Sequence, residues 1–596
     1  MKLKHLLLAL IASPVLFMAS CQNELSGEFP GGATPGTPVN DAEKVTAGII
    51  GIVVNENDIP VAGVTVTSGT NTATTDTRGM FRFKDIQMSK ANATVRVAKS
   101  GYFTAYRTFP ATAGSNHNVR IKLIPKNNSG NFSAATGGAI TIAGGGKLVI
   151  PAGAVADALG NSYSGTVNVA MTWIDPTASN LGDIIMGDLR GVTTGGVERV
   201  LETYGMLGVE LTGSGGQALN IATGKTAELS FPIPASIQGN APATITLWHF
   251  DEATARWKEE GSATKSGSYY IANVKHFSFW NCDAPWPQIN LCMTLVNANG
   301  QPLPNATVRI KRVNTPTSVA YGHTDSLGGL CGIVPKNEPL IMEVMGICNV
   351  PVYTQNIGPF SVNTSLGVVT VNAPASATFT VTGNVVTCSN TPVTNGSVMV
   401  YTSNGQYFSG PVTNGNFSIP IFNCTGNTVN FSAVATDFSA AVQGNAVSGT
   451  GNSGTVNLGT LSACGTSIDQ FINITIDGVP YTWSWPTDSL MHNPGTPIPP
   501  YSVNSYVTGN RLSTGTNSSI QFNFTHNNTL SPYPMLFCTI VLPGLNSQSV
   551  ISPNPTVNIT EIGPVGGFMA GNFGVTMNFS GTPRFVACSF RVKRTG

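Results

Sequence analysis

Short apolar runs separated by turn residues constrain the fold of this chain more than any other feature of its sequence. After the N-terminal leader, no segment keeps a helical stripe of apolar residues over about 12 positions. Runs rich in Val, Thr, Ile and Phe alternate instead with clusters of Gly, Asn, Pro and Asp. This pattern is typical of antiparallel β-sandwiches. We therefore predict an all-β chain, a tandem array of antiparallel Ig-like or transthyretin-like β-sandwich domains that follows a signal peptide and a flexible tether.

Three stretches of the chain repeat one order of strand and turn signals. Each contains an apolar run, a turn with Pro, a second run, a polar turn with Asp or Asn and then Gly, and a third run. The Pro turns contain Pro60, Pro302 and Pro392, and the polar turns lie at 76–79, 325–328 and 414–415. Gly supplies the positive φ that a tight turn needs, and the Asp or Asn side chain caps the turn. The repeat predicts three related sandwiches.

The repeated pattern resembles the carboxypeptidase regulatory-like domain, a seven-stranded, transthyretin-like sandwich. The first copy, 48–125, is the clearest, because Val95–Tyr102 also resembles the late strand and the "KxGY" turn of that family. The second copy, 288–374, and the third, 375–466, keep the turns without that motif. The resemblance implies accessory domains that serve folding and interaction, not catalysis.

Two further segments complete the body of the chain. Segment 130–287 contains a "GG…L.IP.GA" opening at 137–154 and later "FD…W…G" and "HFS.WN" elements. These resemble the sandwich of ankyrins and netrin receptors, and a region of cartilage intermediate-layer proteins and bacterial surface proteins, which implies an extracellular scaffold. Segment 467–596 resembles small C-terminal β-domains of Bacteroidetes-type lipoproteins. Within it, 472–485 reads as a hairpin with Asp477-Gly478 as its turn.

The N-terminus predicts export. Residues 1–20 have a short basic start and an apolar run that is too short to cross a bilayer, as in a signal peptide. Small residues before Cys21 resemble the lipobox of bacterial lipoproteins, which implies lipidation of Cys21, although an ordinary secretory signal with an incidental cysteine is the alternative. The Gly-, Pro- and Thr-rich 21–47 segment is predicted to be a flexible linker. We expect a lipid-anchored protein of the outer membrane that faces the surface or the periplasm.

Nine of the 10 cysteines follow Cys21, and export would permit disulfides. Cys538 and Cys588 share the last unit, so we predict that they pair. Cys388 and Cys424 lie at the ends of repeat strands and form a second candidate pair. The connectivity of Cys282, Cys292, Cys331 and Cys348 stays open. No C-x₂-C pair is present, so we predict no metal site at the cysteines.

The residues of the sequence predict a protein without catalysis, cofactor or metal. His249 and Glu252 match the H-x-x-E spacing of zinc carboxypeptidases, but the motif lies where a strand meets a turn in the scaffold segment. Glu259 and Glu260 could serve glycoside chemistry, and a solvated turn is the favoured interpretation. With a net charge of +1 and only 10% charged residues, the chain is predicted to have no basic surface that binds nucleic acid.

One strand and two tripeptides are candidate interaction or modification sites. Alternation places Tyr481, Trp483 and Trp485 on one face of a strand. Exposed, that face would stack on sugar rings or on an apolar partner; buried, which is the favoured interpretation, it belongs to the core. Ser326 and Ser489, each in an Asp-Ser-Leu tripeptide, resemble the O-glycosylation sites of Bacteroidetes exported proteins.

These observations predict a non-enzymatic, lipid-anchored protein of the cell envelope that acts in surface adhesion, ligand capture or scaffolding. Its expected partners are the membrane, through the anchor, and an unknown protein or glycan, but no nucleic acid. The first alternative is a carbohydrate-binding accessory of a polysaccharide-uptake system, which requires Trp483 and Trp485 to be exposed. The second is an unrecognised hydrolase, which requires a deep pocket with converging carboxylates or histidines.

Overall fold

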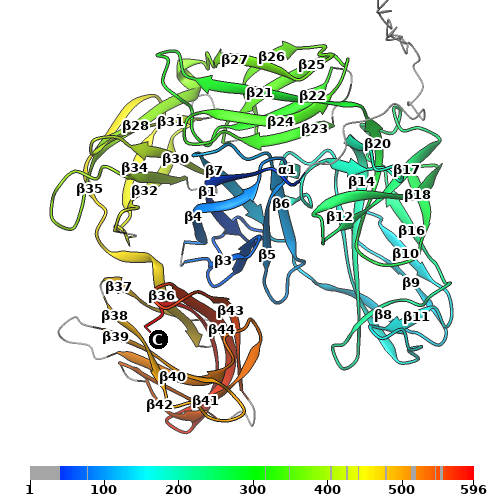
Figure 1. Ribbon diagram of the computed structural model, residues 1–596. Helices are drawn as coiled ribbons and strands as arrows, with labels where there is room; N and C mark the ends of the chain where they lie inside the picture. The colour runs from blue at the N-terminus through cyan, green and yellow to red at the C-terminus, as the bar shows by residue number, and fades with distance from the viewer. Residues whose placement is uncertain are drawn as a thin grey trace, which may run out of the picture. The chain divides into compact units, whose positions relative to one another are not determined.

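The computed structural model describes residues 41–596 except 77, 314, 316, 348, 403–405, 424–426, 441, 477–478, 487, 512–517, 544, 551–554 and 596. The predicted all-β fold is confirmed (Figure 1). Within the described residues, only two short helices interrupt the strands, α1 (Leu181–Ile184) and the 3₁₀ helix η1 (Ala375–Ala377). None of the helices in this part of the chain has the length and apolar character needed to span a membrane. Cys21 lies outside the described residues.

The first sandwich consists of two sheets, with strand orders β4-β1-β7 and β3-β2-β5-β6. Alternation along β5 buries Ala93, Val95 and Val97 between the sheets. The first strand begins at Lys44, so four residues of the segment predicted as linker belong to it. The strands are β1 (Lys44–Val54), β2 (Thr65–Ser68), β3 (Asn71–Thr74), β4 (Met80–Ser89), β5 (Ala93–Ala98), β6 (Ala105–Phe109) and β7 (Asn116–Lys122).

Two later sandwiches repeat this topology. Their three-stranded sheets have the orders β24-β21-β27 and β31-β28-β35, each with an antiparallel and a parallel neighbour of the central strand, as around β1. The third sandwich contains β21 (Gln288–Val296), β22 (Thr307–Arg312), β23 (Ser318–His323), β24 (Gly329–Pro335), β25 (Leu340–Met345), β26 (Pro351–Ile357) and β27 (Thr364–Thr370). The fourth contains β28 (Thr378–Val386), β29 (Gly396–Thr402), β30 (Tyr407–Val412), β31 (Asn416–Phe422), β32 (Val429–Asp437), β33 (Val442–Gln443), β34 (Val447–Gly451) and β35 (Gly454–Ser462).

The turns that defined the sequence repeat hold equivalent places in the three copies. The Pro of each first turn forms an isolated bridge to the end of the first strand, at Val54–Pro60, Val296–Pro302 and Val386–Pro392. In the polar turns of the first two copies, the carboxylates of Asp76 and Asp325 each accept two backbone N–H groups. Gly328 has a φ of +77°, and a Cβ there would lie 2.5 Å from the carbonyl oxygen of Leu295. Only glycine fits this turn without displacing the strand beside it.

The segment between the first and third sandwiches forms a 13-stranded sheet with a large core. Trp280 is fully buried in this core, and Trp248 and Trp257 are fully buried in a second cluster that includes Phe103 and Tyr106 of the first sandwich. Its strands are β8 (Asn128–Ser133), β9 (Gly138–Thr141), β10 (Lys147–Ile150), β11 (Val155–Asp157), β12 (Thr166–Ile174), β13 (Arg190–Val192), β14 (Glu198–Gly213), β15 (Ala218–Ile221), β16 (Ala227–Pro232), β17 (Thr244–Asp251), β18 (Arg256–Ser266), β19 (Tyr269–Val274) and β20 (Phe279–Trp286).

The C-terminal unit begins with the predicted hairpin, in which Ile472 and Ile474 of the first strand face Trp483 and Tyr481 of the second. The turn residues 477–478 lie outside the described residues. The strands are β36 (Thr466–Ile476), β37 (Val479–Pro486), β38 (Asp488–Gly495), β39 (Val503–Arg511), β40 (Ser519–His526), β41 (Pro532–Leu542), β42 (Leu545–Val550), β43 (Thr556–Ile562), β44 (Phe568–Phe579) and β45 (Thr582–Lys593).

The sandwiches also contact one another side by side. Strand β1 is buried on both faces, and Ile50, Ile52 and Val54 on its outer face pack against Tyr407 and Phe438 of the fourth sandwich. Polar bonds join the first sandwich to the third, because Ser115 Oγ donates to Asp325 Oδ2 (2.8 Å) and Asn118 Nδ2 donates to the carbonyl oxygen of Thr324 (3.0 Å). A continuous apolar run is typical of a strand covered on both faces. The chain therefore is more than a series of domains joined by linkers.

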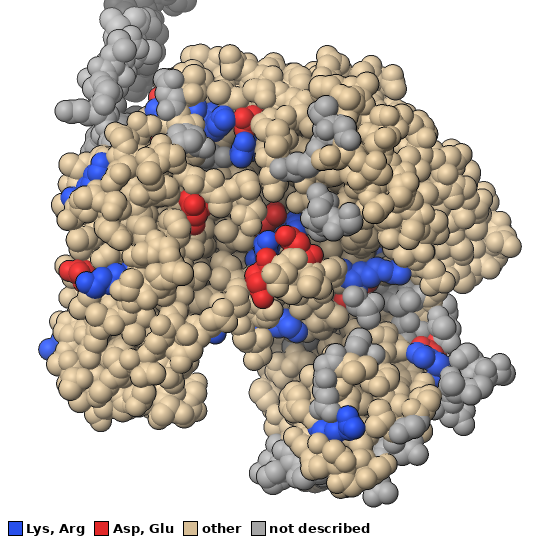
Figure 2. Space-filling view, turned by 180° about the vertical axis from the view of Figure 1, so that it is seen from behind, with Lys and Arg blue, Asp and Glu red and all other residues tan. Residues whose placement is uncertain are grey.

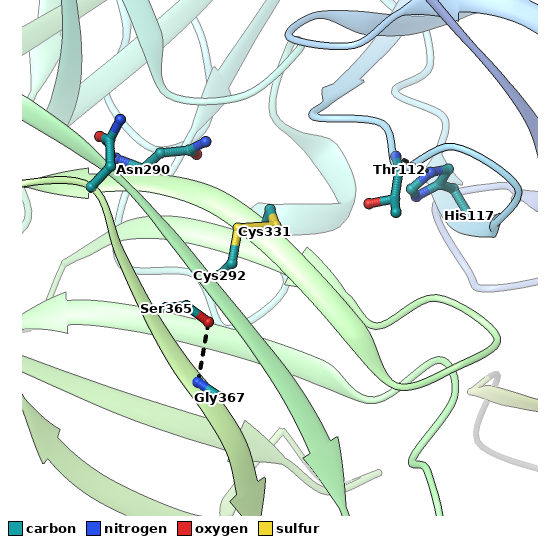
Figure 3. The surroundings of a disulfide bond; sticks show 8 residues. Thr112, His117, Asn290, Cys292, Cys331, Ser365 and Gly367 are labelled. Carbon is teal, nitrogen blue, oxygen red and sulfur yellow. Dashed lines mark hydrogen bonds between the residues drawn. A yellow bond between two sulfur atoms is a disulfide. The ribbon is translucent and has the colours of Figure 1, made fainter.

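The structure contains two disulfides among the described residues, and one of them corrects a predicted pair. Cys292 and Cys331 lie opposite each other on β21 and β24 and are bonded, with 4.1 Å between their Cα atoms (Figure 3). Cys388 is bonded to Cys464, so the predicted Cys388–Cys424 pair is wrong. The reason is that β28 and β35 are parallel neighbours, so the residues that follow them meet at one edge of the sheet. Cys424 and Cys348 lie outside the described residues.

The predicted Cys538–Cys588 disulfide is also wrong, because both thiols are free and buried. Cys538 lies on β41 and Cys588 on β45, and these strands are not neighbours in the sheet. Both side chains belong to the core of the C-terminal unit, and burial raises the pKa of each thiol. Cys282 is a third free and buried thiol. Sharing a unit therefore did not place the two cysteines within bonding distance.

Charged side chains are sparse on the surface. On the face drawn in Figure 2, most of the area carries neither Lys or Arg nor Asp or Glu, and several of the charges lie beside one of opposite sign. This agrees with the low charged fraction of the sequence. A group of buried arginines is therefore unusual in this chain.

Two buried histidines predict acid sensitivity of the C-terminal unit. Ser505 Oγ lies 2.9 Å from His492 Nε2 and 2.8 Å from His526 Nε2 on the three neighbouring strands β38 to β40. Burial, and to a smaller extent the charge of Arg594, lowers the pKa of both histidines to about 4. An unfolded histidine has a pKa near 6.5. The neutral form is thus favoured in the folded state, so the stabilising effect is present above about pH 6.5 and is lost as the pH falls toward 4.

We expect the free energy of unfolding of this unit to fall by about 2–4 kcal/mol between pH 7 and pH 4.5. Hydrogen exchange of peptides from 467–595 in urea, read by mass spectrometry, measures the change. The double variant His492→Gln, His526→Gln is the control, because it should flatten the pH dependence. An unchanged stability between the two pH values in the natural sequence would contradict the expectation.

Candidate ligand pocket

The pocket is lined by residues of the first sandwich, of the loop around α1 and of the third sandwich. Figure 1 shows α1, β7 and β23, which are neighbours in the structure, close together. It has a volume of about 160 Å³, which is room for about five waters or a small ligand. Strands β6 and β7 supply one wall, residues 179–190 a second, and β23 with β24 a third. Four arginines and two aspartates line it, so the described lining carries an excess of positive charge: Arg107, Arg120, Arg190, Arg309, Asp183 and Asp188.

Arg107 is the unusual member of this group. Its Nη1 atom donates to the carbonyl oxygens of Tyr106 (2.7 Å) and Ile185. Its Nε and Nη2 atoms are buried and have no hydrogen-bond partner among the described residues, where the side chain also forms no ion pair. Burial lowers the pKa of Arg107 to about 10, which still leaves it charged at neutral pH. A buried cation of this kind is costly unless an anion compensates it.

The other three arginines are paired with carboxylates of the protein. Arg120 lies 2.6 Å from Asp58 and 3.6 Å from Asp183. Arg190 Nε lies 2.6 Å from Asp188, and Arg309 Nε lies 2.7 Å from Glu343. These pairs neutralise the aspartates of the lining. Arg107 is therefore the one arginine of the described lining that forms no ion pair.

Two histidines of the lining add hydrogen-bonding groups but little charge. His117 Nε2 accepts the backbone N–H of Thr112 (3.0 Å; Figure 3), and His323 Nδ1 lies 3.3 Å from the hydroxyl of Thr307. Burial lowers the pKa of both histidines. Since an ordinary histidine has a pKa of about 6.5, both are neutral at pH 7.

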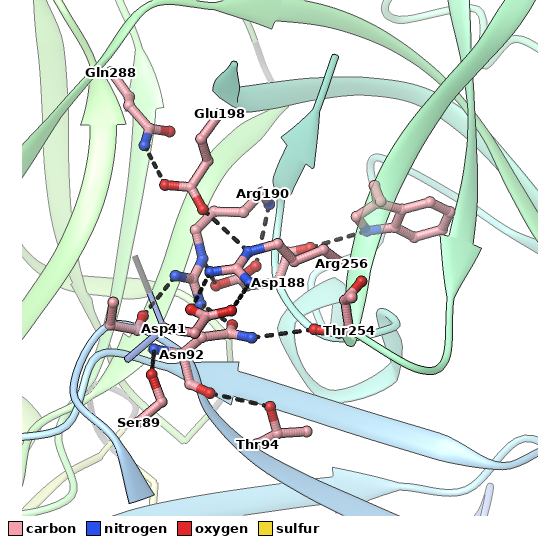
Figure 4. A network of polar contacts seen from close by, with 12 residues as sticks. Asp41, Ser89, Asn92, Thr94, Asp188, Arg190, Glu198, Thr254, Arg256 and Gln288 are labelled. Carbon is pink, nitrogen blue, oxygen red and sulfur yellow. Dashed lines mark hydrogen bonds and ion pairs between the residues drawn. The ribbon is translucent and has the colours of Figure 1, made fainter. Parts of the chain in front are cut away.

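A polar network holds the wall that contains Arg190 against the first sandwich (Figure 4). Arg190 donates from Nη1 to the carbonyl oxygen of Ala91 (2.6 Å) and from Nη2 to Asn92 Oδ1 (2.8 Å). Arg256 extends the network, because it donates to Glu198 Oε1 (3.1 Å) and to Asp41 Oδ1 (2.7 Å). The Arg256 hydrogen bond holds the pKa of Asp41 below its usual value. These hydrogen bonds and ion pairs therefore hold the segment that carries Arg190, one wall of the pocket, in place.

The aromatic strand of the C-terminal unit does not form the exposed platform that the carbohydrate alternative requires. Trp483 is 1% exposed and donates from Nε1 to the carbonyl oxygen of Ser518 (3.2 Å). Tyr481 is half-buried against the same core. Trp485 alone is exposed, at 46%, near the end of β37. The favoured interpretation as core holds for the first two rings only.

The two candidate glycosylation serines lie in different surroundings. Ser326 is half-buried in the polar turn of the third sandwich, and its N–H donates to the carbonyl oxygen of Asn116 (3.3 Å). Ser489 is half-buried within β38, opposite Asn510 of β39. Glycosylation of either serine stays a prediction.

The H-x-x-E residues do not share a site. Glu252 lies in the turn that follows β17 and accepts the hydroxyl of Tyr106 in the first sandwich (2.8 Å), whereas His249 Nε2 lies 3.6 Å from Glu260 Oε2. Glu259 and Glu260 are separated in the same way, since Glu259 accepts the N–H of Thr194 (2.9 Å). Neither pair forms a joint site.

No pattern in the sequence indicates the pocket. Arg107, Asp183 and Arg309 come from three separate segments, and no spacing between them signals a common site. The one available signal was the presence of Arg within strands of a chain that contains few charged residues.

Comparison with known proteins identifies one domain. The carboxypeptidase regulatory-like domain model matches residues 48–124, as predicted for the first copy of the repeat. Cartilage intermediate layer protein 2 of human is 33% identical over 123 residues and that of mouse is 32% identical over 125 residues. Each alignment covers 21% of this chain and 10% of the relative, so the chain spans about a tenth of the length of the relatives it matches.

Solved structures with likeness to the chain include two bacterial proteins. The shaft pilin spaA of Lactobacillus rhamnosus GG is 12% identical, with a TM-score of 0.14, and the match covers 30% of this chain and 98% of the pilin. The Bacillus anthracis TIE protein is 10% identical, with a TM-score of 0.13, and the match covers 78% of this chain and 73% of that protein. Likeness of this degree does not define the arrangement of the domains.

Proposed function

We propose that this chain is a non-enzymatic, lipid-anchored protein of the bacterial cell envelope that captures a small organic anion in the pocket beside Arg107. The lipobox-like segment before Cys21 supports the anchor, and the braced β-sandwich domains support a structural role at the surface or in the periplasm. The guanidinium of Arg107, which forms no ion pair among the described residues and leaves two buried nitrogens without a hydrogen-bond partner there, is the observation that carries ligand capture. A carboxylate is the anion of choice, because the planar guanidinium matches it in charge and geometry.

Several features favour capture over the hydrolase alternative. The pocket contains histidines and carboxylates, as a hydrolase would require, but they are already engaged. His117 accepts a backbone N–H through Nε2, and Asp183 and Asp188 are paired with arginines. A general base must be available to take a proton from substrate, and these groups are not.

Isothermal titration of the full-length chain carrying Cys21→Ser tests ligand capture. The probes are succinate and glucuronate, with glucose as the uncharged comparison. We expect a carboxylate probe to bind and the variant Arg107→Met to weaken its affinity by about 10- to 100-fold, as the loss of a charge-assisted hydrogen bond predicts. Lys147→Met is the matched control, because Lys147 is an exposed cation on β10, outside the pocket lining. Failure of both carboxylates to bind, or equal binding to Arg107→Met, would overturn the proposal.

Protease shaving of intact cells tests the location. The chain carries a tag after Arg594, and Cys21→Ser serves as the unanchored comparison. Loss of the tag while periplasmic markers survive indicates a surface-facing array, and protection until the outer membrane is opened indicates a periplasmic one. A Cys21→Ser chain that stays in the membrane fraction would overturn lipid anchoring.

A further inference from the structure

A second cluster of polar side chains lies in the 13-stranded sheet, apart from the pocket. His249 on β17, Glu260 on β18 and His276 in the loop after β19 each offer one ligand atom, and these atoms all lie within 4.8 Å of one another. The side chains are 19%, 33% and 34% exposed, so the cluster is open to small ions from solvent. Two imidazoles and one carboxylate are a donor set that suits zinc and related divalent transition metals.

The local structure explains why these residues meet. Strands β17 and β18 are antiparallel neighbours, with His249 opposite Lys258. Alternation therefore puts Glu260, two residues beyond Lys258, on the side of the sheet that carries His249. A shift of register between Thr246 and Trp248 lies next to this pair, and Gly261, with a φ of +89°, follows Glu260. A β-bulge of this kind re-aims side chains.

The loop that carries His276 is held by a tryptophan of the core. Trp280 is fully buried and donates from Nε1 to the carbonyl oxygen of His276 (3.0 Å). Its ring lies 4.8 Å from the ring of His276 and 5.5 Å from that of His249, centroid to centroid. The indole ring thus contacts both imidazoles, so the two ligand rings are held in position without a metal ion.

The distances within the cluster match those around a tetrahedral ion. One carboxylate oxygen, Glu260 Oε2, lies 3.2 Å from His276 Nε2 and 3.6 Å from His249 Nε2. Two ligand atoms at about 2.0–2.1 Å from a tetrahedral zinc ion lie about 3.3–3.4 Å from each other. Glu260 Oε2 therefore already lies at close to the required spacing from each imidazole nitrogen, and the ligand atoms of the two histidines lie within 4.8 Å of each other.

We propose that His249, Glu260 and His276 bind a divalent transition metal ion, with Zn²⁺ as the best fit, and leave a fourth position open to water or to a group from a partner. The neighbouring charges do not compete for these atoms, because Lys258 is paired with Asp251. The donor set disfavours Mg²⁺ and Ca²⁺, which prefer oxygen ligands. This inference is independent of the anion pocket.

Titration of the full-length chain carrying Cys21→Ser with Zn²⁺, after removal of metal with a chelator, is the direct test. We expect one Zn²⁺ per chain, and we expect Glu260→Gln, His249→Ala and His276→Ala each to weaken the affinity at least about tenfold. Glu259→Gln is the matched control, because that carboxylate faces the other side of β18 and should leave zinc binding unchanged. Mg²⁺ should not compete.

A second readout separates this site from the free thiols, which also favour zinc. Co²⁺ bound through nitrogen and oxygen gives visible absorption without a thiolate charge-transfer band, and that band should be absent here. Circular dichroism of each variant establishes that it is folded, and Glu260→Gln, the conservative change, remains informative if an alanine variant is not. The absence of Zn²⁺ binding, or binding that is unchanged in folded Glu260→Gln and His276→Ala, would show a metal-free ion-pair cluster and overturn the proposal.

Discussion

Replacing Trp483 by alanine is expected to lower the free energy of unfolding of the C-terminal unit by about 3–5 kcal/mol. The indole is 1% exposed and packs among Ile472, Val507 and Ile520 in the core formed by β36 to β45. Its removal leaves a cavity that the surrounding strands fill only in part, and the carbonyl oxygen of Ser518 loses its donor. Trp485→Ala, two residues along the same strand, should lower the stability clearly less than Trp483→Ala does, because that ring is 46% exposed.

The two variants should be compared by pulse proteolysis in urea, with the fragments of 467–596 quantified by mass spectrometry. This measurement reads the C-terminal unit and not the first transition of a multidomain chain. A glycan array on both variants gives the complementary result. If Trp483→Ala retained full stability and lost binding to a sugar, the ring would be part of a binding platform and its burial in the core would be wrong.

The sequence was sufficient for the fold because the signals of a sandwich are local. Alternation in 93–98 and the Asp-to-Gly turns at 76–79 and 325–328 each involve neighbouring residues, and the chain repeats them. The continuous apolar run of β1 likewise indicates that this strand is buried on both faces. What covers the outer face, Tyr407 and Phe438, lies more than 300 residues away in the sequence, and no local pattern identifies such a neighbour.

The candidate sites were not predictable for the same reason. Arg107 becomes unusual only because the carbonyls of Tyr106 and Ile185 engage one of its nitrogens and no carboxylate of the described residues forms an ion pair with it. The spacing of His249 to Glu252 would place both side chains at one site on a helix, where residues three apart share a face. On a strand the residue that joins His249 comes from the neighbouring strand, and the register of β17 with β18 decides that it is Glu260.

The Cys388–Cys464 disulfide should be the main covalent support of the fourth sandwich. It closes a loop of 76 residues and ties the second residue after β28 to the second residue after β35. By the chain-entropy relation, a loop of this length stabilises the folded state by about 4.5 kcal/mol. We expect the double variant Cys388→Ala, Cys464→Ala to lose most of this amount, measured by hydrogen exchange of peptides from 375–466 in urea.

The Cys292–Cys331 bond supplies the matched comparison, because it closes a shorter loop of 39 residues in a sandwich of the same topology. The same relation gives about 3.9 kcal/mol for it, so the double variant Cys292→Ala, Cys331→Ala should cost slightly less, and the loss should appear in peptides from 288–374. Non-reducing peptide mapping decides the pairing itself. A peptide that links Cys388 to Cys424 instead of Cys464 would restore the pairing that the sequence suggested, and the parallel register of β28 with β35 would then need to change, because that register is what brings Cys388 and Cys464 together.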